Sequence, residues 1–87
     1  VIAIRNFQKE LMSRAQESVD FVAPENRHII STTLTANAQG VQDIKNMITD
    51  LQNKIIGYSD SHVDHDKLYH LNVQFFPMSR GQDEDKY

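Results

Sequence analysis

The chain has 87 residues, which is enough for one small domain, and its lack of cysteine excludes disulfides and thiolate metal sites such as zinc fingers. Nine Lys and Arg residues against twelve Asp and Glu residues give a formal net charge of −3, which is not the basic balance of a nucleic-acid-binding module. This charge balance predicts no direct nucleic-acid contact. No apolar run approaches the roughly 20 residues of a membrane span, so we expect a soluble domain without a membrane anchor.

Residues 2–20 predict an amphipathic helix. Apolar side chains recur there at spacings of three and four residues, which places them on one stripe of a helix. The stripe consists of Ile4, Phe7, Leu11, Ala15 and Val19. Pro24 ends the pattern, because proline lacks an amide hydrogen and pushes the preceding residue away from helical geometry. Since the chain begins at Val1 with this helix already under way, we expect it to be a piece excised from a longer protein.

Two later segments predict β-strands. Residues 27–36, RHIISTTLTA, are rich in β-branched residues and alternate between two faces. Residues 67–78, KLYHLNVQFFPM, alternate in the same way and stop at Pro77. One face of this second strand carries Tyr69, Leu71, Val73 and Phe75, and the other carries Leu68, His70, Asn72, Gln74 and Phe76.

A second amphipathic helix is predicted between the two strands. Asn37 or Thr35 caps its N-terminus by accepting backbone amide hydrogens, and Gly57 suits its C-terminal end. The stripe that we expect to be buried consists of Val41, Ile44, Met47 or Ile48, Leu51 and Ile55.

These elements predict one helix-strand-helix-strand domain over residues 1–80, of the α/β (α+β) class. A crossover helix between parallel strands is right-handed, which places both helices on one face of a small sheet. Two strands make a marginal sheet with unpaired edges, so we expect a second copy to extend it in a homodimer. Residues 81–87 are polar and acidic, and we expect this tail to be disordered because it has too little apolar surface to offset the entropy of ordering.

The segments ENRHIISTTLTANAQGVQDIKNMITDLQNKII and LYHLNVQFFPMS together resemble a known domain. It is the C-terminal domain of a family of uncharacterised bacterial proteins, known mainly from predatory and fibre-degrading bacteria, in which it follows a winged-helix or helix-turn-helix region. The positions that carry the resemblance are Arg27, Ser31, Leu34, Thr35, Ile44, Ile48, Tyr69, Leu71, Asn72, Gln74, Phe76 and Pro77. The resemblance implies a cytoplasmic, transcription-regulator-like protein with an N-terminal domain as partner, and it implies no chemical activity.

Residues 59–70, SDSHVDHDKLYH, gather side chains of the kind that bind zinc-class metals. The candidates are His62, Asp64 and His65. Zincin-type sites place two histidines on a rigid helix, whereas these residues follow a helix in a polar connection. We therefore expect a solvated loop with neither metal nor cofactor. The alternative is a metal-binding or metal-dependent hydrolytic domain that uses the His and Asp cluster at 60–70.

A polar strand face is the candidate interface or ligand site. With helices over one side of the sheet, the other side would carry Arg27, Ser31, Thr33, His70, Asn72 and Gln74. These side chains suit the polar interface of a dimer or a small ligand, and an ordinary solvent-facing surface is the alternative. The sequence has no nucleophile elbow and no glycine-rich phosphate loop, so we do not expect an enzyme. We expect a non-enzymatic oligomerisation or effector-sensing C-terminal module of a transcription-regulator-like bacterial protein.

Overall fold

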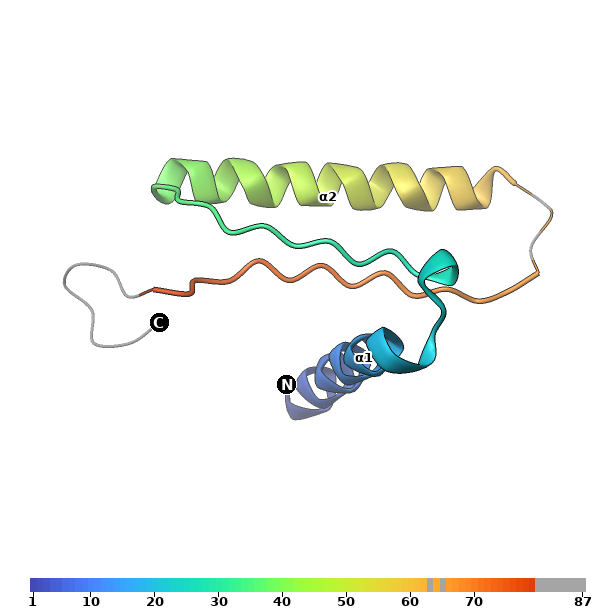
Figure 1. Ribbon diagram of the computed structural model, residues 1–87. Helices are drawn as coiled ribbons and strands as arrows, with labels where there is room; N and C mark the ends of the chain where they lie inside the picture. The colour runs from blue at the N-terminus through green and yellow to red at the C-terminus, as the bar shows by residue number, and fades with distance from the viewer. Residues whose placement is uncertain (63, 65, 80–87) are drawn as a thin grey trace. The chain divides into compact units, whose positions relative to one another are not determined.

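The computed structural model describes residues 1–62, 64 and 66–79, and two long helices dominate it (Figure 1). Helix α1 spans Ile2–Phe21, the short 3-10 helix η1 spans Pro24–Asn26, and helix α2 spans Ala38–Asp60. The chain divides into two units, Val1–Thr35 with α1 and η1, and Ala36–Tyr87 with α2. Among the described residues, no helix is both long and apolar enough to cross a membrane. The predicted tail at 81–87 lies outside the described residues.

The predicted α/β fold is wrong, because the described residues contain no β-strand and the fold is all-α. Residues 27–36 and the described part of 67–78 are neither helix nor strand (Figure 1). Their composition favours an extended backbone, and Arg27 has one, with φ −136° and ψ 159°. A strand also needs a hydrogen-bonded neighbour, which propensity alone does not supply. The sheet with both helices on one face, and its extension by a second copy, are therefore wrong as well.

Helix α1 confirms the helix predicted over residues 2–20 and continues to Phe21. Its end is where Pro24 predicts it. Val22 is extended at φ −110° and ψ 131°, and its backbone N–H donates to the carbonyl oxygen of Ser18 at 3.1 Å. Ala23 is also extended, as expected for a residue that precedes proline, and Pro24 then opens η1.

Helix α2 begins at the predicted cap and ends later than predicted. The side-chain Oδ1 of Asn37 accepts a hydrogen bond from the backbone N–H of Gly40 at 2.8 Å, which confirms Asn37 as the cap. Gly57 lies inside the helix, which continues to Asp60, so the predicted end at Gly57 is wrong. The Ser61 backbone N–H donates to the carbonyl of Gly57 at 3.1 Å, and its hydroxyl donates to that of Tyr58 at 2.8 Å. These bonds supply hydrogen-bond donors to the carbonyl oxygens of the last turn, and they do not require a glycine at the helix end.

None of the described residues is buried, so they do not form the predicted core. The α1 stripe is exposed apart from Leu11, which is half-buried. On α2 the side chains Val41, Ile44 and Ile48 are half-buried. Leu51 and Ile55 keep 51% and 42% of their surface exposed. Both stripes have the predicted spacing, but the prediction that the α2 stripe is buried is wrong for the described residues.

Replacing Asn37 by alanine is expected to destabilise α2 by about 1 kcal/mol, because the amide of Gly40 loses its side-chain acceptor. Asn37→Asp is the matched control, since a carboxylate accepts the same bond and adds a negative charge at the helix N-terminus. Thermal denaturation followed by far-ultraviolet circular dichroism measures the difference. Identical melting of the alanine variant and the wild type would contradict the capping role.

Candidate functional site

The six residues of the predicted polar face are divided between the two units of the structure. Arg27, Ser31 and Thr33 belong to Val1–Thr35, and His70, Asn72 and Gln74 belong to Ala36–Tyr87. The sheet that would bring them onto one face is absent from the described part of the chain. A single site made of all six residues therefore stays a prediction, and each half is characterised by its own contacts.

Arg27 closes the turn that follows α1. Its guanidinium Nη1 donates a hydrogen bond to the carbonyl oxygen of Val22, the C-cap residue of that helix. The last turn of α1 contains no basic residue of its own. Arg27 therefore supplies the positive charge that stabilises a helix C-terminus, and it does so from five residues downstream. This contact, together with the half-buried position of Arg27, gives the residue a structural role.

His70 and Asn72 contact each other through their side chains. Nε2 of His70 lies 2.9 Å from Oδ1 of Asn72, a hydrogen-bond distance in which the ring nitrogen donates to the amide oxygen. Asn72 is half-buried, whereas His70 and Gln74 are exposed. The alternation of the sequence predicts that residues two apart share a side of an extended segment, and this contact agrees with it. His70 and Asn72 therefore form a small polar pair. Gln74 is the next residue of the same alternating series in the sequence.

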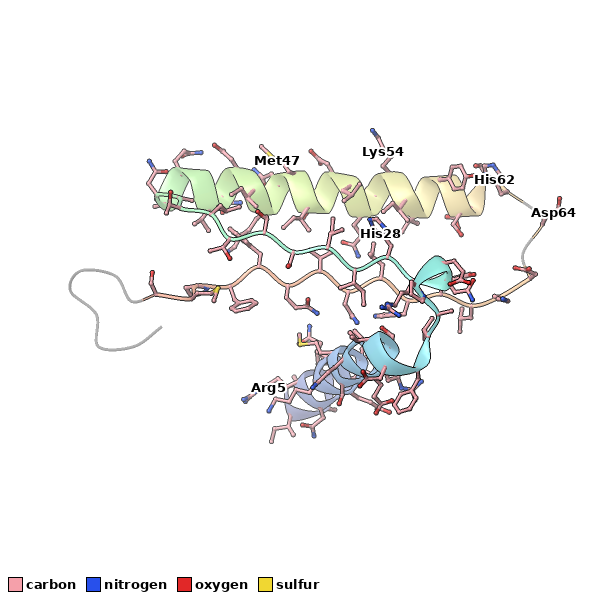
Figure 2. The ribbon with its side chains drawn as sticks, viewed as in Figure 1. Arg5, His28, Met47, Lys54, His62 and Asp64 are labelled. Carbon is pink, nitrogen blue, oxygen red and sulfur yellow. The ribbon has the colours of Figure 1, made fainter. Side chains whose placement is uncertain are left out.

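His62 holds the C-terminal end of α2 (Figure 2). Its ring stacks on the ring of Tyr58, with centroids 4.0 Å apart and an interplanar angle of 28°. Its Nδ1 lies 2.7 Å from the carbonyl oxygen of Tyr58 and 3.1 Å from the hydroxyl of Ser61. Tyr58 was not among the residues predicted from the sequence, although its position four residues before His62, at the end of a predicted helix, indicated a contact. His62 thus belongs to the termination of a helix.

Asp64, the other metal candidate among the described residues, forms no metal-binding group with His62. Asp64 lies farther along the connection after α2 (Figure 2), and His65 lies outside the described residues. Within residues 1–62, 64 and 66–79, no three His, Asp or Glu side chains form a group that could hold a metal ion. The alternative metal site therefore has no geometric support from this part of the chain.

A shallow depression of about 580 Å³ lies along α1 and its C-terminal end, and it is open to solvent. An ion pair crosses this side of the helix, with Arg14 Nη2 and Glu10 Oε1 3.3 Å apart and both side chains largely exposed. The residues that line the depression are Glu10, Ser13, Arg14, Glu17, Ser18, Phe21 and Val22. Ligand sites enclose most of the surface of their ligand, which a depression walled by one helix and its end does not do.

Comparison with known proteins gives one family match. A family model described as "Domain of unknown function (DUF4423)" matches residues 1–78, which include both helices and both segments predicted as strands. No curated protein and no solved structure matches the chain. The match carries no activity, ligand or partner for the residues described above.

We predict that zinc, nickel and manganese will each give equally weak heats with the wild type and with a His62→Ala, His65→Ala double variant. The physical reason is that no three His, Asp or Glu side chains among residues 1–62, 64 and 66–79 form a group that could hold a metal ion, and His62 alone supplies one ligand. Isothermal titration calorimetry measures the heats, and circular dichroism of the variant controls for fraying of α2. A strong heat in the wild type that disappears in the variant would overturn this prediction and restore the metal alternative.

Proposed function

We propose an assembly function for this chain, which belongs to the DUF4423 family of domains of unknown function. The chain acts as a non-enzymatic oligomerisation module and forms a homodimer. Its setting is a cytoplasmic, transcription-regulator-like bacterial protein in which an N-terminal domain precedes it, as the resemblance of LYHLNVQFFPMS and the preceding segment implies. Oligomerisation is favoured over effector sensing because the depression along α1 is too open to enclose a small ligand.

The exposure of the apolar side chains supports this proposal. No described residue is buried, although a chain of this size normally buries about 60% of its unfolded surface when it folds. Full burial of one Val, Leu, Ile or Phe side chain contributes about 1.5–3 kcal/mol. Leu51, Ile55 and Phe7 are examples of side chains that keep a large part of their surface, at 51%, 42% and 62%. A chain with this much apolar surface is stabilised strongly by any partner that covers it.

A second copy of the same chain is the simplest partner. Monomeric soluble proteins rarely expose large contiguous apolar patches, whereas most oligomers are built from identical subunits in closed symmetric arrangements. The apolar stripes of α1 and α2 run along helices of 20 and 23 residues, so the available surface is long enough for an extended contact. Burial of these stripes in a dimer would couple folding of the chain to its association.

The proposal predicts a melting temperature that rises with protein concentration. An increase from about 1 to about 100 µM is expected to raise it by roughly 10 °C, because mass action stabilises a chain that folds only as a dimer. Sedimentation equilibrium over the same range should show the mass change from monomer to dimer. A variant without the Asn37 cap serves as control, since it lowers the melting temperature without altering its dependence on concentration.

A clean monomer at tens of micromolar with a concentration-independent, cooperative melt would contradict the assembly function. Such a result would mean that one chain covers its own stripes.

A further inference from the structure

Helix α2 carries its apolar side chains in a seven-residue repeat. Six apolar side chains from Val41 to Tyr58 are separated alternately by three and four residues, whereas Met47 and Ile56 lie outside this series. In the heptad notation, position a holds Val41, Ile48 and Ile55, and position d holds Ile44, Leu51 and Tyr58. A mean apolar period of 3.5 residues is the pattern of helices that pair with one another in a left-handed coiled coil.

The C-terminal part of this seam is open. Leu51, Ile55 and Tyr58 keep 51%, 42% and 67% of their surface exposed. The ring of Tyr58 is also held at the helix end by its stacking on His62. These three side chains follow one another on the same side of α2, so a partner helix that lies along the seam contacts all of them.

The residue types at the seam favour two strands in a parallel arrangement. All three a positions are β-branched, and the d position at the beginning of the open part is Leu51. β-Branched residues at a with leucine at d favour parallel dimers, because the side chains at the two positions enter the facing helix with different geometries. Ile44 and Tyr58 depart from this rule, and they lie at the N-terminal and C-terminal ends of the seam.

The flanking positions are compatible with a second copy of the same helix. In a parallel pair in register, each g side chain faces the e side chain of the next heptad in the other helix. Met47 would face Gln52 of the second copy, and Lys54 would face its Ser59, so neither pair brings like charges together. Figure 2 shows Met47 and Lys54 on one side of α2, as expected for two g positions. The acidic residues Asp43 and Asp50 fall at c, away from the seam.

We propose that α2 pairs with α2 of a second copy as a parallel two-stranded coiled coil centred on Leu51, Ile55 and Tyr58. This inference rests on the assembly function proposed above and names the surface that performs it. The occupant of the seam is a second α2, and neither α1 of another copy nor another segment of the same chain fills it.

Single cysteine variants of the full chain test the pairing, because the wild type contains no cysteine. Disulfides need Cα atoms roughly 4.4–6.8 Å apart. Parallel pairing brings the two copies of position 58 within reach of each other in Tyr58→Cys, and does the same for position 51 in Leu51→Cys. In an antiparallel pair centred between residues 51 and 58, position 58 of each copy lies beside position 51 of the other, so the two positions 58 would be separated by roughly 10 Å along the axis at ~1.5 Å per residue. Asn53→Cys is the matched control, because position f lies opposite the seam.

We expect mild oxidation to convert Tyr58→Cys and Leu51→Cys to covalent dimers at least ~10-fold faster than Asn53→Cys, since pairing raises the effective concentration of the thiols. Non-reducing electrophoresis measures the rates, and sedimentation equilibrium measures assembly of the reduced proteins. A reduced dimer whose positions 51 and 58 cross-link no faster than position 53 overturns the parallel pairing of α2 but leaves the assembly function standing. Fast cross-linking at 51 without cross-linking at 58 overturns the parallel arrangement. A wild type that is monomeric in sedimentation equilibrium overturns both proposals.

Discussion

Burial of two apolar helix stripes is the constraint on which this chain depends. Each helix has local support, such as the Asn37 cap of α2 and the pair of Arg14 with Glu10 on α1. Contacts of this kind contribute only tenths of a kcal/mol to about 1 kcal/mol each. Most helical stability in proteins comes from packing of an amphipathic face, and no described side chain is buried. We propose that a second copy of the chain supplies the missing packing.

The helices were predictable from the sequence because their determinants are local. The apolar spacing, Pro24 and the Asn37 cap act within a few residues, and both helices begin where these signals place them. The absence of strands from the described residues was not predictable, because a strand depends on hydrogen bonds to a second strand, and the sequence of one segment does not show whether that second strand forms. The composition of residues 27–36 and 67–78 favours an extended backbone. An extended backbone alone does not supply the neighbouring strand that a sheet requires.

For the candidate site, too, the sequence indicated that residues near each other in the chain share a side, but it could not establish the grouping of distant residues. The contact of His70 with Asn72 agrees with the alternation of the sequence. The grouping of these residues with Arg27 depended on a sheet, and the described contact of Arg27 is with the carbonyl of Val22 instead. His62 has the chemistry of a metal ligand, yet its ring nitrogen contacts the end of α2. Residue type alone does not distinguish a ligand from a helix cap.

The central claim is that α2 gains its stability from association, and amide hydrogen exchange of α2 at two protein concentrations tests it most directly. Amides of residues 44–58 have backbone partners inside the helix, so their exchange reports how often the helix opens. The account predicts protection that rises in proportion to dimer population, with the largest change around Leu51 and Ile55. Strong protection that is identical in dilute and concentrated protein would contradict it, because the helix would then be stable within a single chain.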